Sequence, residues 1–190
     1  MSTDQENYRR YLGGDNDGLT QIIIKYHGGL LRFLTTYVGN YDDAEDVLQD
    51  TFTRIAIKKP AFRPMRGEDD GFKAWLYVIA RNEARQFLRK RRRQAEYLVS
   101  DSDVPVLAEI VDYRPGPEET VIREDEVRHL KDAMRSLEEE QYRVIYLRYF
   151  EDMQVRDIAR TLGKSENYIY RVLEKARDIL AKIREKGDDK

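Results

Sequence analysis

The chain has 190 residues, of which 41% are hydrophobic and 37% charged, with no cysteine and a net charge of −2. This length suits one medium domain or two small ones, and the absence of cysteine excludes disulfides and cysteine-ligated zinc. No apolar run reaches membrane-spanning length and the N-terminus lacks a signal-peptide pattern. We therefore expect a cytoplasmic protein with no membrane segment of its own.

The first residues are polar, with Tyr8, Tyr11 and Leu12 as possible packing points before a break at residues 13–16. Apolar residues then recur at helical spacing and predict a helix over residues 17–38.

The next predicted helix covers residues 43–58, with Asp42 as its expected N-cap. Its exposed face carries a patch of four polar side chains: Glu45, Asp46, Gln49 and Asp50. Acids in a first turn complement the helix dipole, which explains Glu45 and Asp46 well. Gln49 and Asp50 are explained less well, and a protein partner for an acidic surface is the alternative.

After a loop at residues 59–71, a helix with two different faces is predicted over residues 72–93. An apolar stripe contains Phe72, Trp75, Leu76, Ile79, Ala80, Ala84 and Phe87. A second stripe, at intervals of four, contains Lys73, Tyr77, Arg81, Arg85 and Arg89, with Glu83 the single acid. A solvated face normally mixes charges, so a one-signed stripe with aromatic residues indicates a nucleic-acid surface.

Residues 94–120 hold seven acids, three prolines and one base, and read as an extended acidic interdomain linker. On sequence alone a solvated spacer is the preferred interpretation. Helical patterns resume over residues 121–137 and again over residues 138–150.

A short helix over residues 155–162, a turn at Gly163 and a longer helix capped by Ser165 follow the pattern of a helix-turn-helix. The second helix exposes side chains that can pair with base edges or phosphates: Asn167, Tyr168, Tyr170, Arg171, Glu174, Lys175 and Arg177. A plain αα-hairpin in a helical bundle is the structural alternative. Both histidines, His27 and His129, stand alone and no phosphate-binding loop or metal-ligand motif occurs, so we expect no catalytic site, no metal and no cofactor.

Two motifs together resemble a known family. Residues 43–52 (DAEDVLQDTF) and 72–82 (FKAWLYVIARN) are similar to region 2 of the extracytoplasmic-function (ECF) sigma factors of bacterial RNA polymerase. Residues 137–180, with the RYFE motif at 148–151, DIA at 157–159 and LG at 162–163, resemble their region 4. The resemblance implies an all-α fold of two small domains, residues 1–93 and 121–186, joined by the linker at residues 94–120.

The family also implies roles for particular residues. The residues expected to bind core RNA polymerase are Asp46, Gln49, Asp50 and Phe52. Those expected to recognise and melt the −10 promoter element are Lys73, Trp75, Tyr77, Arg81, Asn82 and Arg85, with a flipped-base pocket in the loop at residues 62–71. Trp75 fits equally well as a core residue.

The resemblance implies that the helix-turn-helix binds the −35 element of promoter DNA as a duplex. The expected contact residues are Asn167, Tyr170, Arg171, Glu174, Lys175 and Arg177. The linker would run toward the RNA exit path of the polymerase, and an anti-sigma factor is the expected regulatory partner.

Three hypotheses follow, and none assigns a catalytic residue. The first is a non-enzymatic ECF sigma factor that confers promoter specificity on core RNA polymerase. The second is an autonomous helix-turn-helix transcriptional regulator, which would bind its operator tightly without polymerase. The third is a nucleic-acid enzyme, which needs a cluster of metal-binding carboxylates that the sequence does not suggest.

Overall fold

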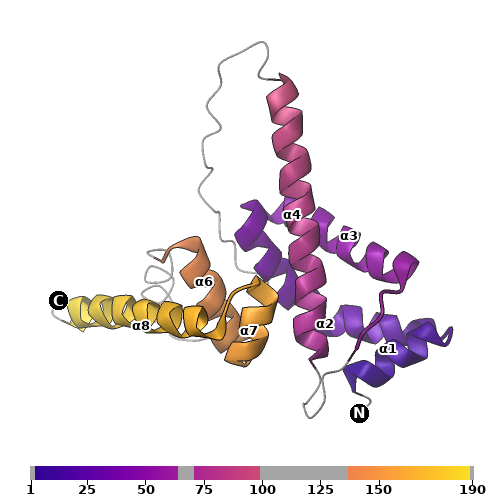
Figure 1. Cartoon of the computed structure of the whole chain (residues 1–190), viewed down its shortest axis with the longest axis horizontal. Coiled ribbons are helices and arrows are strands. Elements are labelled where there is room, and N and C mark those ends of the chain that lie inside the picture. The colour runs from indigo at the N-terminus through magenta and orange to yellow at the C-terminus, as the bar shows by residue number, and fades with distance from the viewer. Residues whose placement is uncertain (1–2, 64–70, 99–136, 189–190) are drawn as a thin grey trace. The chain divides into compact units, whose positions relative to one another are not determined.

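The computed structural model describes residues 3–63, 71–98 and 137–188, and every regular element in these ranges is a helix (Figure 1). The chain divides into two compact units, residues 1–112 and 113–190. The all-α fold expected from the sequence is thereby confirmed. The predicted helix at residues 121–137 lies outside the described residues, except for its last position, Leu137, which is buried.

The first unit begins with a helix that the sequence analysis did not predict, α1 (Asp4–Leu12). Thr3 and Glu6 form a reciprocal capping box at its start: the Thr3 hydroxyl accepts from the Glu6 N–H at 3.2 Å, and the Glu6 carboxylate accepts from the Thr3 N–H at 2.7 Å. Tyr8 and Tyr11 are buried as expected, whereas Leu12 is 43% exposed and does not pack. The capping box therefore starts a helix in a stretch with few apolar residues.

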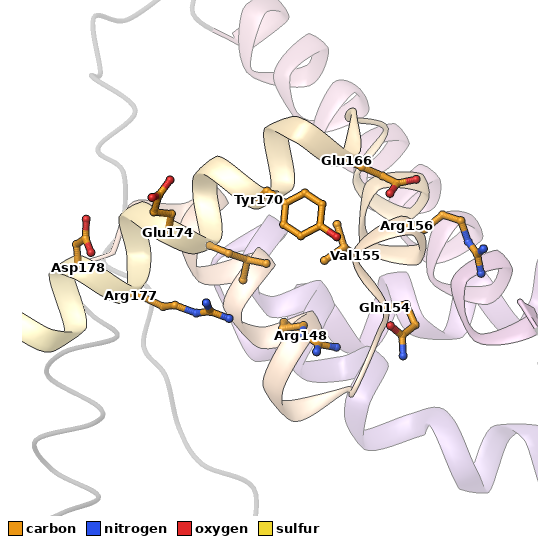
Figure 2. Close-up of a pocket in the computed structure, with 10 residues that line it drawn as sticks. Arg148, Gln154, Val155, Arg156, Glu166, Tyr170, Glu174, Arg177 and Asp178 are labelled. Carbon is orange, nitrogen blue, oxygen red and sulfur yellow. The ribbon is translucent and has the colours of Figure 1, made fainter.

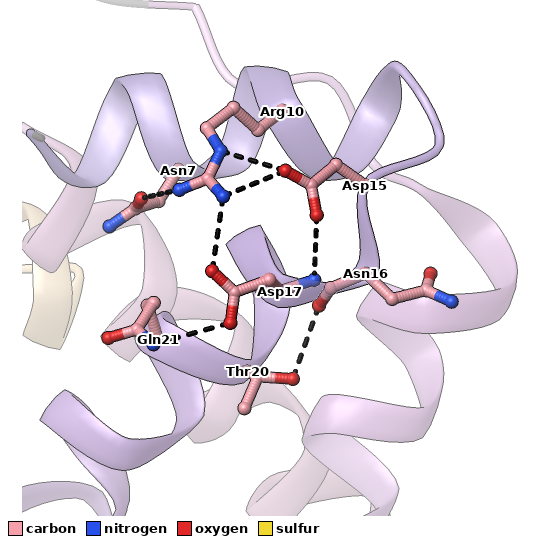
Figure 3. A network of polar contacts seen from close by, with 7 residues as sticks. All are labelled: Asn7, Arg10, Asp15, Asn16, Asp17, Thr20 and Gln21. Carbon is pink, nitrogen blue, oxygen red and sulfur yellow. Dashed lines mark hydrogen bonds and ion pairs between the residues drawn. The ribbon is translucent and has the colours of Figure 1, made fainter.

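Helix α1 lies in backbone contact with α2 (Asn16–Val38), and a glycine makes this contact possible. A Cβ atom at Gly18 would lie 2.1 Å from the Asn7 carbonyl oxygen. Arg10 of α1 adds two ion pairs, here called the Arg10 clasp, by binding Asp15 at 2.8 Å and Asp17 at 3.1 Å (Figure 3). The two helices are therefore fixed together through both backbone and side chains.

Helix α3 (Tyr41–Lys58) starts one residue after its cap, Asn40, whose side-chain oxygen accepts from the Asp43 N–H at 2.8 Å. The expected cap at Asp42 is wrong, because Asn40 is the residue with extended backbone here and Asp42 already lies in the first turn. The helix ends where Lys59 adopts a left-handed conformation with φ of 42°, which is uncommon for a residue other than glycine.

Helix α4 (Phe72–Leu98) packs on α2 and α3 and buries the apolar stripe read from the sequence at Phe72, Leu76, Ala80 and Ala84. It continues beyond the predicted end at Arg93. The first residues assigned to the linker are thus helical, since neither glycine nor proline interrupts residues 94–98. The remainder of the predicted linker lies outside the described residues.

The second unit contains α6 (Glu139–Ile145), the π-helical turn η2 (Tyr146–Phe150), α7 (Val155–Leu162) and α8 (Glu166–Asp188). Its small core draws one or more apolar side chains from each element: Val144, Ile145, Leu147, Ile158, Ile169, Val172, Leu173 and Ala176. Phe150, at the end of η2, is 55% exposed and lies outside this core. The wider π-helical turn shifts the register of the side chains that follow it.

The close contact at Gly18 generates a stability prediction with a matched control. Replacing Gly18 by Ala forces the α1 and α2 backbones apart and should destabilise the protein by about 1–3 kcal/mol. Gly28 lies in the same helix, and its added Cβ would meet nothing nearer than Arg32 at 3.7 Å. Gly28→Ala should therefore stabilise the protein by up to about 1 kcal/mol. Urea unfolding followed by Trp75 fluorescence measures both, and equal effects would contradict the contact.

Candidate functional site

The basic face of α4 keeps its positive charge because the acid within it is paired with another helix. Glu83 binds Arg54 of α3 at 2.7 Å, and its side chain is only 12% exposed. Arg85 is exposed and Lys73 is half-buried on the same helix. A carboxylate held against α3 does not pair with these cations, so this face presents mainly positive charge to an approaching polyanion.

Tyr77 does not belong to this face, contrary to the sequence prediction. Its ring is 0% exposed and lies 5.0 Å from the ring of Phe33 in α2. Residues spaced by four advance about 400° around a helix, so a stripe at this interval rotates by about 40° at each step. The stripe that begins at Lys73 therefore crosses the core at Tyr77. A buried ring cannot stack on a base, so Tyr77 is a core residue here.

Arg81 is the most constrained cation of α4. Burial lowers the pKa of its guanidinium; Tyr37 opposes this shift and the positive charge of Arg85 adds to it. Its Nε and Nη1 atoms are buried without a hydrogen-bond partner in the described part of the chain, while Nη2 donates to the side chain of the exposed Asn82 at 3.2 Å. Buried donors without acceptors are costly, and an acceptor that reached Arg81 would offset this cost.

Trp75 packs in an aromatic cluster and also keeps part of its surface accessible. The rings of Phe72, Tyr8 and Phe62 lie 5.0, 5.1 and 5.5 Å from it. Such distances are typical of aromatic contacts that add to apolar burial. Trp75 is therefore a packing residue that remains partly available at the surface.

The acidic surface predicted on α3 is exposed, with one exception in the expected contact set. Asp46, Gln49 and Asp50 all point to solvent, as does Glu45. Phe52 is only 9% exposed and packs in the domain core. The three exposed residues can meet a partner directly, whereas Phe52 supports the helix from beneath.

The second unit has the geometry of a helix-turn-helix. Gly163 ends α7 in a left-handed conformation with φ of 68°, and the Ser165 hydroxyl accepts from the Tyr168 N–H at 3.2 Å. Both features were predicted from the sequence. The turn brings the N-terminal ends of α7 and α8 to one side of the domain (Figure 2).

An open groove of about 770 Å³ lies on this side, between η2, α7 and α8 (Figure 2). Three residues of the predicted reading face line it: Tyr170, Glu174 and Arg177. Five further polar residues line it that the sequence analysis did not assign: Arg148, Gln154, Arg156, Glu166 and Asp178. Arg148 belongs to the RYFE motif, so the sequence offered a reason to assign it. Gln154 and Arg156 line the groove only because the turn brings α7 beside α8.

Arg171 and Lys175, by contrast, line a second hollow of about 240 Å³ with Glu138 and Glu140. Lys175 lies 3.4 Å from Glu138, and the Arg171 guanidinium lies 5.9 Å above the Tyr168 ring. The predicted reading face is therefore split over two sides of α8, with the exposed Asn167 at its start. Exposed ion pairs of this kind are weak, so Lys175 can exchange its partner at little cost.

A hydrogen-bonded group at Glu140 ties α6 to the turn of the helix-turn-helix. Its carboxylate accepts from the Tyr168 hydroxyl at 2.6 Å and lies 2.9 Å from the Lys164 amine. Burial alone would raise the pKa of Glu140, but these two hydrogen bonds and the nearby positive charges outweigh it and lower the pKa. The same bond raises the pKa of Tyr168.

No group of acidic or histidine side chains suited to hold a metal ion occurs within residues 3–63, 71–98 and 137–188. None of the helices in the described part of the chain is both long and apolar enough to cross a membrane.

Known protein families match both units. Residues 22–94 match the model of sigma-70 region 2, and residues 128–180 match that of sigma-70 region 4. The ECF RNA polymerase sigma factor BldN of Streptomyces coelicolor is 27% identical over 94% of this chain and 64% of its own length. The ECF RNA polymerase sigma-E factor of Haemophilus influenzae is 29% identical over 90% of this chain and 92% of its own length.

Solved structures share the fold. The sigma factor RpoE of Bartonella quintana, in complex with the anti-sigma factor NepR, aligns with a TM-score of 0.63 at 24% identity, over 90% of this chain and 98% of that chain. CnrH, in complex with the cytosolic domain of CnrY, aligns with a TM-score of 0.61 at 21% identity, over 96% and 97% of the two chains.

Both regions occur in the order that defines the family and together cover most of the chain, so this chain belongs to the ECF group of sigma-70 factors. It is a sigma factor for transcription initiation, and binding to core RNA polymerase and promoter DNA is general to this family. Of the three hypotheses raised by the sequence, the family assignment supports the first.

The Glu140 group generates a pH prediction. Because the folded-state pKa is depressed, its stabilisation is present at neutral pH and is lost as the pH falls through the folded pKa. Glu140→Gln should therefore destabilise the second unit by about 1 kcal/mol at pH 7 and by much less at an acidic pH below the folded pKa of Glu140. Urea unfolding followed by circular dichroism measures this loss, since the single tryptophan reports the other unit. An equal loss at both pH values would contradict the assignment.

Proposed function

We propose that this sigma factor docks on core RNA polymerase through the exposed acidic surface of α3, formed by Asp46, Gln49 and Asp50. The helix dipole accounts for the acids in the first turn of α3, Asp42 and Asp43. Asp46, Gln49 and Asp50 all lie beyond this turn. Their exposure on a rigid, well-packed helix supports a contact with a protein partner. Phe52 contributes by holding the helix in place.

The observation that carries the proposal is the separation of charge between α3 and α4. The acidic surface of α3 suits a protein, and the basic face of α4 suits an opened DNA strand. Lys73, Arg81, Asn82 and Arg85 provide phosphate and base contacts in this assignment. Trp75 offers an aromatic surface for the −10 element, whereas the buried Tyr77 supports the helix from within.

The groove of the second unit is proposed to receive the −35 element. Tyr170 and Glu174 face base edges, while Arg148, Arg156 and Arg177 meet phosphates. Asn167, Arg171 and Lys175 extend the contact along α8, once Lys175 leaves Glu138. The free chain binds DNA weakly, because its net charge is −2.

The same proposal places the protein in the cytoplasm, with no catalytic activity of its own and with an anti-sigma factor as its regulator. Support for the regulator comes from RpoE and CnrH, whose structures are complexes with NepR and with the cytosolic domain of CnrY. An anti-sigma factor would compete with core polymerase for the sigma factor.

The docking surface is tested by the affinity for core polymerase. Gln49→Ala and Asp50→Ala should each weaken binding about tenfold, since truncation of a central contact typically costs about 1–2 kcal/mol. Both residues are exposed, so the thermal stability should not change. Glu139→Gln removes an equally exposed acid from the other unit and should leave the affinity unchanged. Normal core affinity in Gln49→Ala and Asp50→Ala would rule out this surface.

The groove is tested by the salt dependence of binding to duplex −35 DNA. Arg156→Gln should weaken binding equally for all sequences and reduce the slope of log K against log salt by about one. Tyr170→Ala should instead relax sequence preference and leave the slope unchanged. Lys58→Gln, which removes an exposed cation from the first unit, serves as the control. An unchanged slope in Arg156→Gln would show that DNA does not enter the groove.

A further inference from the structure

Helix α1 lies outside the segment that matches sigma-70 region 2, yet its Tyr8 ring contacts Phe72 and Trp75 at the start of α4, the helix proposed to hold −10 DNA. Two of its tyrosines donate hydrogen bonds to the backbone at the end of α3. The Tyr8 hydroxyl donates to the Pro60 carbonyl at 2.7 Å, and the Tyr11 hydroxyl donates to the Ala56 carbonyl at 2.8 Å. These two bonds lie on either side of Lys59.

Lys59 is where the chain turns out of α3, and its backbone is in a costly conformation. It has a φ of 42° without being a glycine, and its N–H donates to the Ile55 carbonyl at 3.0 Å. Residues in such conformations persist only where the surrounding structure holds them. The Lys59 amine also lies 5.1 Å above the Tyr11 ring. Tyr8 and Tyr11 thus hold the turn from both ends.

The Tyr8 ring continues the same support into the aromatic cluster. It lies 5.1 Å from the ring of Trp75 and 5.6 Å from that of Phe72. Phe62, two residues beyond Pro60, completes the cluster at 5.5 Å from Trp75. The Tyr8 side chain therefore fixes both the segment that follows α3 and the partly exposed indole of Trp75 at the start of α4.

Helix α1 can act as a rigid support because its other side is fixed to α2. Beyond the Gly18 contact and the Arg10 clasp, the buried Asp4 carboxylate receives the Lys25 amine at 2.7 Å and the Tyr26 hydroxyl at 2.6 Å. Burial raises the pKa of Tyr8 to about 12, so its hydroxyl remains a donor at physiological pH.

We propose that Tyr8 and Tyr11 are positioning residues for −10 recognition: their hydroxyls fix the turn after α3, and the Tyr8 ring fixes Trp75, in the geometry that captures the opened strand. This role rests on the proposed function of α4. Neither tyrosine touches DNA. Both act by setting the positions of Phe62 and Trp75 before DNA arrives, which reduces the ordering cost of binding.

The test uses the full chain assembled with core polymerase, and variants that remove hydroxyls while keeping every ring. Tyr8→Phe, Tyr11→Phe and the double variant delete the two bonds to the α3 turn. Thr35→Val is the matched control, because it deletes a buried hydroxyl bond within α2 that does not involve α1. The probe is a fork-junction DNA from a promoter that the reconstituted wild-type holoenzyme transcribes.

The double variant should bind this DNA about three- to tenfold more weakly, while its affinity for core polymerase changes by less than about twofold. Trp75 is the single tryptophan of the chain, so its fluorescence reports the cluster directly. Acrylamide should quench Trp75 more readily in the double variant than in the wild type. Thr35→Val should retain wild-type DNA binding and quenching.

Each other result has a defined meaning. Wild-type holoenzyme that fails to hold the fork-junction DNA would overturn the proposed function. Wild-type binding together with unchanged binding by the double variant would overturn only the positioning role. An equal loss of DNA binding in Thr35→Val would show that the effect is general destabilisation and would overturn the positioning role. An equal loss of core affinity in the double variant would do the same.

Discussion

The charge distribution on the surface of the first unit depends on the contact between α3 and α4, because this contact pairs opposite charges from the two helices. Arg54 of α3 binds Glu83 of α4, and Asp43 of α3 binds Arg91 of α4 at 2.7 Å. Arg54 thus neutralises Glu83, the acid on the basic face of α4. Asp43 neutralises Arg91, one of the arginines of α4. What remains exposed is acidic on α3 and basic on α4. A chain of net charge −2 can in this way offer one surface to a protein and another to DNA.

The second unit has a smaller core, and it also holds a helix in place while leaving polar side chains of that helix exposed. Its π-helical turn leaves Tyr149 and Phe150 more than half exposed, and Tyr149 accepts from Arg177 at 3.0 Å. That bond holds an arginine at the edge of the groove. On the opposite side of α8, Glu140 of α6 accepts from the Tyr168 hydroxyl at 2.6 Å and binds Lys164 in the preceding turn at 2.9 Å. Helix α8 is therefore fixed by polar contacts on both sides, while its central residues remain available to contact DNA.

Helical periodicity predicted most of the fold, and its failures have physical causes. The turn at Gly163 and the cap at Ser165 were predicted because local chemistry dictates them. Helix α1 was missed because a capping box and buried tyrosines, rather than an apolar stripe, define it. Tyr77 was misplaced because a spacing of four drifts across the helix surface. The sequence could not predict that Gln154 and Arg156 line the groove, because they meet α8 only after the turn has formed.

The central claim is that this chain gives core RNA polymerase its promoter choice and does little on DNA alone. The most direct measurement is sequencing of transcript starts from genomic DNA with reconstituted holoenzyme. The account predicts starts that share one pair of −35 and −10 sequences, none with core polymerase alone, and weak duplex binding by the free chain. Tight, sequence-specific binding by the free chain, or identical starts with and without it, would contradict the account.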